Sequence, residues 1–292
     1  MIKGKSPYPF ETIALAVGFT PRLEALVKAV RRMQQQYDAK VVFIHVGKKT
    51  SEKQRLLSSS LNQYGFNDFN AKVFWEQGDV TESILRVCKQ QVVDLLVMGA
   101  WSRQNRVAYY LGTVSRDVAR KAKCSVLLLT DPQEHAGPFK KIAVNGHDHI
   151  KTPFTVNTAL YLADKDMAPE VVVVNEVDVP AMAMSISEDV ADYELELLRK
   201  SMAAEVQVRQ RQLRDKLEAH ASSLQFVSVS GRSGHSIGQF ARTEQVDLLV
   251  VNSPDHSLSI FDRIFIHDIE HLLSELPCNL LVVHSRFGAI EQ

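Results

Sequence analysis

A stretch that occurs twice decides the fold: residues 78–98 read GDVTESILRVCKQQVVDLLVM, and residues 231–251 read GRSGHSIGQFARTEQVDLLVV. The apolar end of the first stretch, Asp94-Leu95-Leu96-Val97, returns 153 residues later as Asp247-Leu248-Leu249-Val250. Self-similarity at a fixed offset marks a repeated structural unit. The chain therefore contains two copies of one unit.

Each copy alternates short apolar runs with segments of helical period. The runs are rich in Val, Ile and Leu throughout, as parallel strands that are covered on both faces require. Strand–helix–strand connections of this length give right-handed crossovers and a doubly wound sheet. We predict an α/β fold with two tandem doubly wound open sheets of about five mainly parallel strands each. The predicted strands are 12–17, 41–46, 71–75, 94–98 and 125–129 in the first copy, and 141–144, 171–175, 226–229, 247–251 and 280–283 in the second.

The second copy carries an insertion. The first apolar runs, IAL at 13–15 and IAV at 142–144, are only 129 residues apart, whereas the later stretches are 153 residues apart. The second copy therefore contains about 24 extra residues, which we place between Pro180 and Gly231. This region has no Gly or Pro from 181 to 230, and we predict a helix from Ile186 to about Ser222. Its apolar stripe packs on its own sheet or, alternatively, binds a partner. The stripe consists of Leu195, Leu198, Met202, Val206, Leu213 and Leu217.

A turn-rich segment, 130–139, joins the copies, because Asp131-Pro132 and Gly137-Pro138 interrupt all periodicity there. The predicted domains are therefore 1–135 and 136–292. The final strand of each copy lies at a sheet edge, so the two edges can pair within the chain as a pseudo-dimer. Whole chains could in addition form a homodimer, and the sequence does not decide this.

Composition excludes several classes of protein. The 292 residues include 34 Lys and Arg against 34 Asp and Glu, and this zero net charge argues against a nucleic-acid partner. No uncharged apolar run approaches the roughly 20 residues that span a bilayer, so we expect no membrane association. The three cysteines form no CxxC pair, which argues against thiolate zinc sites and a disulfide framework and fits a cytoplasmic location.

Three segments of the first copy together resemble one known family. They are DLLVMG at 94–99, LGTVS at 111–115 and CSVLLL at 124–129. This series resembles the universal stress protein family, which has an adenine nucleotide alpha hydrolase-like fold and a phosphate loop of the form Gly-x-x-Gly, nine residues, then Gly-Ser or Gly-Thr. Here Gly99 is followed by Ser102, nine residues and Gly112-Thr113, so three of the four elements match.

The resemblance implies a cytoplasmic stress-response regulator or sensor that binds ATP or another adenine nucleotide in the first copy. It implies Mg²⁺ only together with the nucleotide, and at most slow ATP hydrolysis. The alternative is an interaction scaffold or small-ligand-binding protein that binds no nucleotide and uses its helices or clefts for a protein or small-molecule partner. The residues implied to bind the nucleotide are Val46, Gly99, Ser102, Arg103, Gly112, Thr113 and Ser115.

The loop also makes physical sense as an anion site. Gly99 lets the backbone approach a phosphate, and Gly112-Thr113-Val114-Ser115 opens a helix whose free N–H groups and positive dipole end face the same place. Arg103 adds positive charge. The alternative reading is structural, with Gly99 permitting a turn and Thr113 capping a helix.

Two departures from the family pattern limit the prediction. ATP-binding members resemble one another in an Asp directly after the first strand; Gly18 stands there in the first copy, and we take Asn145 as the corresponding residue of the second. The second phosphate loop is lost, with Asn252 in place of Gly99, Asp255 in place of the second glycine and Phe265-Ile266-His267-Asp268 in place of the helix start. We expect no ATP binding in the family's manner there.

Two histidine-containing segments raise the question of metal binding. His267-Asp268-Ile269-Glu270-His271 fits the inverted zinc-peptidase pattern H-x-x-E-H, but the repeat places it on a short helix of a different fold. His147-Asp148-His149 reads first as a polar turn after a strand. A metal-dependent hydrolase therefore ranks last among the functions, and we predict no catalytic or metal-binding residues.

Overall fold

The computed structural model describes residues 8–102, 109–130, 137–168, 170–177, 192–217, 224–231, 234–254 and 269–285. The strands are β1 (Thr12–Ala16), β2 (Lys40–Val46), β3 (Ala71–Glu76), β4 (Leu95–Gly99), β5 (Trp101–Ser102), β6 (Tyr109–Tyr110), β7 (Ser125–Leu129), β8 (Lys141–Asn145), β9 (Glu170–Val177), β10 (Leu224–Ser230), β11 (Leu248–Asn252) and β12 (Asn279–Val283). The helices are α1 (Leu23–Tyr37), α2 (Ser51–Gln63), α3 (Val80–Gln90), α4 (Thr113–Lys121), α5 (Thr152–Asp166), α7 (Asp192–Asp215) and α8 (His235–Thr243).

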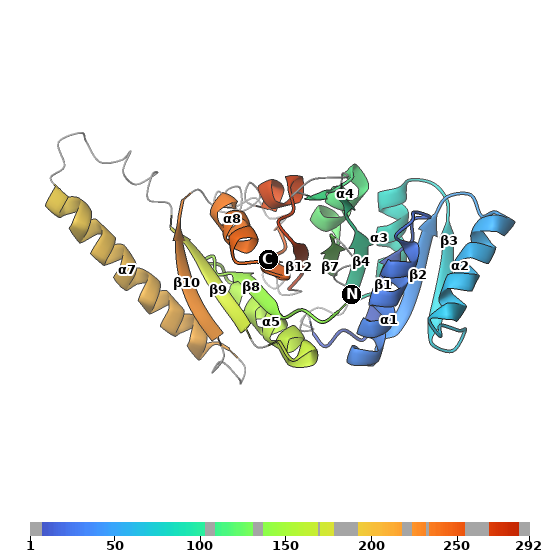
Figure 1. Ribbon diagram of the computed structural model, residues 1–292, viewed down its shortest axis with the longest axis horizontal. Coiled ribbons are helices and arrows are strands. Elements are labelled where there is room, and N and C mark those ends of the chain that lie inside the picture. Colours follow the sequence, from blue (N-terminus) through green and yellow to red (C-terminus); the bar gives the residue numbers. More distant parts are fainter. Residues whose placement is uncertain are drawn as a thin grey trace, which may run out of the picture.

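Ten strands form one continuous sheet in the order β10-β9-β8-β11-β12-β7-β4-β1-β2-β3 (Figure 1). Within each half of this sheet, five strands run parallel in the doubly wound order that the sequence predicts. The two halves meet where β7 and β12 pair antiparallel, with Leu127 opposite Leu281. The final strands of the two copies therefore cover each other's edges within one chain.

Helices cover both faces of the sheet (Figure 1). One face packs against α1, α2 and α5 through side chains such as Leu26, Leu57 and Val156. The other packs against α3, α4 and α8 through side chains such as Ile84, Val118 and Ile237. Because both faces are covered, β7, β11 and β12 are buried along their whole length, which explains their uninterrupted apolar sequences.

The repeated Asp has a structural role in each half. Asp94 Oδ2 accepts hydrogen bonds from the backbone N–H groups of Glu11 and Thr12, both at 3.0 Å. Asp247 Oδ2 accepts from the corresponding groups of Lys140 and Lys141, at 2.8 and 2.9 Å. Each carboxylate thus ties the start of the first strand of its copy to the start of the central strand, which accounts for the repetition of Asp-Leu-Leu-Val.

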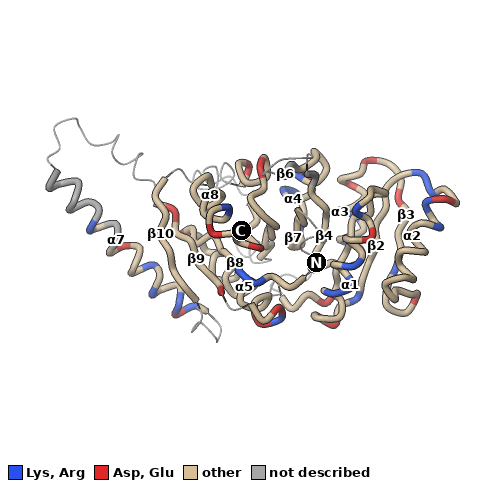
Figure 2. The backbone as a smooth tube through the Cα atoms, in the orientation of Figure 1, with Lys and Arg blue, Asp and Glu red and all other residues tan. Residues whose placement is uncertain are grey.

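Ion pairs connect the halves on both sides of the sheet. On one side, Arg32 of α1 lies 2.6 Å from the fully buried carboxylate of Asp166 in α5, which also accepts a hydrogen bond from Phe139 N. On the other side, the Arg120 guanidinium of α4 binds both carboxylate oxygens of Glu270. Elsewhere, acidic and basic residues are interspersed over the described parts of both halves, in keeping with the zero net charge (Figure 2).

The inserted helix α7 lies beside β10, the outermost strand of the second half (Figure 1). It spans 192–215, a shorter range than the predicted 186–222; residues 178–191 and 218–223 lie outside the described residues. Leu213 and Leu217 of the predicted stripe pack against the protein's own core. Arg214 adds a cation–π contact with the Phe226 ring of β10, at 4.7 Å. This end of the insertion therefore packs on its own sheet.

Candidate functional site

A cavity of about 730 Å³ lies at the carboxyl ends of the central strands of the first half. Parallel α/β sheets bind ligands at this edge, where neighbouring crossovers leave in opposite directions. The end of β1, the end of β4 and the starts of α1 and α4 contribute to its lining. Four of the predicted site residues are brought together there: Val46, Gly99, Gly112 and Ser115.

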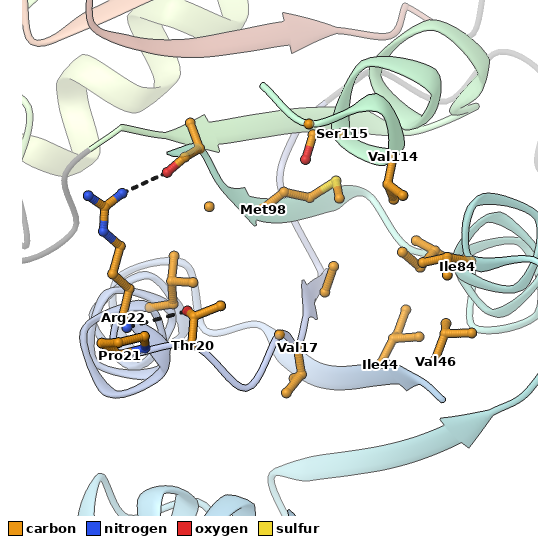
Figure 3. Close-up of a pocket in the computed structure, with 17 residues that line it drawn as sticks. Val17, Thr20, Pro21, Arg22, Ile44, Val46, Ile84, Met98, Val114 and Ser115 are labelled. Atoms are coloured by element: carbon orange, nitrogen blue, oxygen red, sulfur yellow. Dashed lines mark hydrogen bonds between the residues drawn. The ribbon is translucent and has the colours of Figure 1, made fainter. Parts of the chain in front are cut away.

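Aliphatic side chains form most of the cavity wall. Figure 3 shows Ile44 and Val46 of β2 facing Ile84 of α3 and Val114 of α4, with Met98 reaching in from β4. Among the described residues that line the cavity there is no Asp, Glu or His. The cavity can therefore enclose an apolar group, but its described lining offers no group that could act as a general base.

The start of α4 supplies the polar element. Gly112 is the N-cap, with φ −65° and ψ 161°, and no side chain caps the helix. The first-turn N–H groups of an α-helix lack intrahelical acceptors, and α4 has no acidic residue in its first turn to occupy them. The positive end of the helix dipole therefore points to a place that suits an anion.

Gly99 has a packing role that the sequence did not reveal. A Cβ atom built on Gly99 would lie 3.1 Å from Cδ1 of Leu26 in α1, which is tighter than ordinary van der Waals contact. The small residue therefore lets α1 pack closely over the end of β4. By contrast, a Cβ on Gly112 would have no heavy atom within 4 Å.

Arg22 is a cavity residue that the sequence analysis missed. Its Nη1 donates to the carbonyl oxygens of Ala100 at 2.7 Å and Thr130 at 3.3 Å, so it ties the start of α1 to the residues after β4 and β7. The repeat contains a signal for it. Lys151, 129 residues later, donates from Nζ to the Ser253 carbonyl at 3.4 Å, in the equivalent place of the second half.

The remaining predicted site residues are not among the described residues that line the cavity. Thr113 is the first residue of α4 and is exposed, but it does not line the cavity. Ser102 lies on the short strand β5, which pairs with β6 through Tyr109. Arg103 lies outside the described residues. The structure thus brings part of the predicted loop to the cavity and leaves the charge at Arg103 as a prediction.

The strand register corrects one equivalence that we drew from the sequence. Ile13 pairs with Leu95 and Ile142 with Leu248, so the first strands of the two copies match at an offset of 129. Asn145 therefore corresponds to Ala16, not to Gly18. The error arose because Gly18 and Asn145 each follow a valine, and because the apolar run of the first copy, 13–17, is longer than that of the second, 142–144, although the two strands have equivalent bounds.

In the second half a buried amide stands at the end of the central strand. Asn252, which stands where Gly99 stands, is buried; its Nδ2 donates to Thr152 Oγ1 at 3.2 Å, and its Oδ1 accepts from Thr155 Oγ1. The hollow beside Asn175 and the His147 turn measures only about 60 Å³. Small-molecule sites typically need roughly 300 Å³ or more, so this hollow is too small for a nucleotide.

The two histidine segments form no metal cluster among the residues that the structure describes. His267 and Asp268 of the zinc-peptidase pattern lie outside those residues, as do Asp255, Phe265 and Ile266. His271 Nε2 lies 2.9 Å from His235 Nδ1 on α8. At the other segment, the backbone N–H of His147 donates to Asn145 Oδ1 at 3.1 Å, as in a polar turn. No described helix is long and apolar enough to span a membrane.

Comparisons with known proteins agree with this architecture. A universal stress protein from Pseudomonas aeruginosa UCBPP-PA14 superposes with a TM-score of 0.70 at 14% identity, covering 94% of this chain and 93% of its own. A universal stress protein from Archaeoglobus fulgidus DSM 4304 gives 0.61 at 14% identity, covering 93% and 95%. A search of the curated proteins found no match. The universal stress protein family model matches residues 66–130 and 149–284, in both halves of the sheet. The chain therefore belongs to the universal stress protein family, as a tandem member with two copies of the unit.

Proposed function

We propose that the first half binds an adenine nucleotide in the 730 Å³ cavity, and that the protein acts as a stress-response regulator or sensor. The observation that carries this proposal is the meeting of an uncapped helix start at Gly112 with a nucleotide-sized apolar cavity. In this arrangement the phosphates lie against Gly112 and Ser115, and the base lies among the aliphatic residues around Val46. Ser102, Arg103 and Thr113 add contacts to the phosphates, and Mg²⁺ enters only with a triphosphate.

The proposal includes slow turnover at most. The described lining has no carboxylate or imidazole to activate a water molecule. The protein therefore holds its nucleotide rather than consuming it. We also propose a cytoplasmic location, which is supported by three cysteines that are buried and unpaired.

An isotherm for ATP, ADP and AMP with the purified full-length protein tests this function directly. We expect saturable binding with one nucleotide per chain, because the first half offers the 730 Å³ cavity and the second half has the buried amide of Asn252 in place of the loop glycine. Binding of two nucleotides per chain, or of none, would contradict the proposal.

A second candidate is a small-ligand-binding stress protein that uses no nucleotide. The aliphatic wall and the glycine at position 18 favour it, because the described lining has no acid to recognise a base or ribose. Native mass spectrometry of the purified protein separates the two candidates. A retained apolar molecule that added ATP does not displace would favour this second function.

A further inference from the structure

A second cavity, of about 430 Å³, lies at the opposite edge of the first half. Its wall comes from α3, from the end of α4, and from the residues just before β4 and β7, including Val93 and Lys123. It therefore lies at the amino ends of the strands, whereas the proposed nucleotide site lies at their carboxyl ends. Nothing in the proposed function uses it.

Two of the protein's three cysteines meet in this cavity. Cys88 of α3 and Cys124, just before β7, both line it, and each exposes 6% of its surface. Cys124 is the group that most strongly influences the ionisation of the Cys88 thiol. The two sulfur atoms are thus neighbours that a small reagent reaches only through the cavity.

The lining is strongly basic. Arg86, Lys89, Lys121 and Lys123 contribute four cationic side chains, against one carboxylate from Glu82. Arg86 lies 2.7 Å from Glu76, which offsets part of its charge, whereas the three lysines are exposed at the surface. A concave site with one sign of charge raises the local concentration of small ions of the opposite sign.

We propose that this cavity is a thiol-modification site, at which a small anionic disulfide such as glutathione disulfide joins Cys88 and Cys124 into a disulfide. The site combines three features: two neighbouring thiols, a cavity that can hold one glutathionyl half of the reagent, and a basic lining that attracts carboxylates. The inference is independent of nucleotide binding.

The chemistry takes two exchange steps. The Cys124 thiolate attacks one sulfur of the disulfide reagent, a Cys124–glutathionyl bond forms, and one glutathione leaves as a thiolate that takes up the proton lost by Cys124. The Cys88 sulfur then attacks Cys124, its proton passes to the second glutathione as that leaves, and the Cys88–Cys124 bond forms. The protein loses two electrons and two protons, and the reagent becomes two glutathione molecules.

The order of attack follows from the environment of Cys88. Contact with Cys124, and then burial, raise the pKa of the Cys88 thiol well above its usual range. Since the thiolate is the attacking species, Cys88 is the thiol that waits in protonated form and resolves the intermediate.

The second half provides an internal control. Cys278 occupies the place of Cys124, but Ala241 stands where Cys88 stands, 153 residues later. Burial raises the pKa of the Cys278 thiol to about 12, and its Sγ donates to the Asn279 carbonyl at 3.3 Å. Cys278 is therefore a buried thiol without a partner cysteine, and we expect it to stay reduced.

The experiment treats reduced full-length protein with glutathione disulfide or with the cationic disulfide cystamine, each rate normalised to that of a free small thiol. We expect two of the three thiols to be lost, a mass decrease of two hydrogens, and a Cys88–Cys124 peptide on mapping. At low salt the anionic reagent should react about tenfold faster or more, and this advantage should shrink in high salt. Intact thiols, a disulfide that includes Cys278, or faster reaction with cystamine would each overturn the proposal.

Variants separate the roles of the residues. In the Cys88→Ala variant, which carries the residue found at the same place of the second half, the reaction should stop at a mixed disulfide between Cys124 and glutathione. If this variant gains no glutathionyl group, the assigned order of attack is wrong. Lys89→Glu with Lys121→Glu should slow the reaction with glutathione disulfide about tenfold or more. Lys140→Glu with Lys216→Glu, two exposed lysines of the other half, makes the same change in net charge and should leave the rate unchanged. Equal rates in the two charge-reversed proteins would show that the basic lining does not attract glutathione disulfide.

Discussion

Gly112→Asp is the sharpest test of the nucleotide site. The backbone of Gly112, at φ −65° and ψ 161°, suits any residue, and a Cβ there has no heavy atom within 4 Å. Aspartate is also a preferred N-cap residue, so the folded state should be as stable as the wild type or more stable by a few tenths of a kcal/mol. The substitution therefore places a negative charge at the proposed phosphate site without disturbing the fold.

The size of the effect follows from Coulomb's law. A carboxylate about 5 Å from one phosphate charge costs about 3 kcal/mol at an effective dielectric constant of about 20, and about 0.8 kcal/mol in bulk water. Gly112 is exposed at the mouth of the cavity, so we expect a value between these limits, about 1 to 3 kcal/mol. This corresponds to roughly 5- to 150-fold weaker binding of ATP.

The assay is isothermal titration of ATP into three proteins: the wild type, Gly112→Asp and Gly112→Asn. Asparagine has nearly the same shape and also caps helices, so the difference between the two variants isolates charge. We expect Gly112→Asn to bind ATP within a few-fold of the wild type. If Gly112→Asp binds as tightly as Gly112→Asn, with unchanged melting, the phosphates do not lie at the start of α4.

Three further predictions concern the fold and the cavity. Asp94→Ala and Asp247→Ala should each lower the free energy of unfolding in urea by about 1.5–3 kcal/mol, because each leaves two strand N–H groups without their carboxylate; unchanged midpoints would refute this role. Gly18→Asp should strengthen ATP binding about tenfold, and more than Ala16→Asp does, because Gly18 lies after β1 at the cavity, where the family has its Asp; an equal gain from both variants would contradict this role. Burial raises the pKa of Tyr37, so stability should be complete below about pH 10 and fall above it, and Tyr37→Phe should flatten that fall in urea midpoints measured from pH 8 to 11.

The sequence predicted the central strands well because they are buried on both faces. Continuous apolar runs such as 126–129 must lie in the core of the domain, and the repeat identified each strand twice. The extent of the inserted helix was harder to predict, since a stretch without Gly or Pro contains no signal for its ends. The observed α7 ends at Asp215, and β10 begins at Leu224, two residues before its predicted start.

The site was predictable only in part, and for a physical reason. Gly112 was found because it matches the family's phosphate loop, and the structure places it at the start of α4. Arg22 was missed because its partners, Ala100 and Thr130, are distant in sequence and offer backbone carbonyls, which leave no residue-specific signal. The misalignment of Gly18 with Asn145 has a similar origin, because the pairing of strands fixes the equivalence and local sequence does not.

One pair of contacts distinguishes the two copies at the end of the central strand. In the first half Leu26 of α1 packs over Gly99; in the second, Thr155 occupies the place of Leu26 and hydrogen-bonds with Asn252, which occupies the place of Gly99. The first half thus pairs a large apolar side chain with a glycine, and the second half pairs a small polar side chain with the amide of Asn252. A buried amide needs its hydrogen-bond partners, so Asn252 is held where it fills the space at the end of β11. The Leu26–Gly99 contact and the Thr155–Asn252 hydrogen bond are therefore alternative solutions to the same packing problem, and we expect Asn252→Gly alone to leave Thr155 without its buried partner.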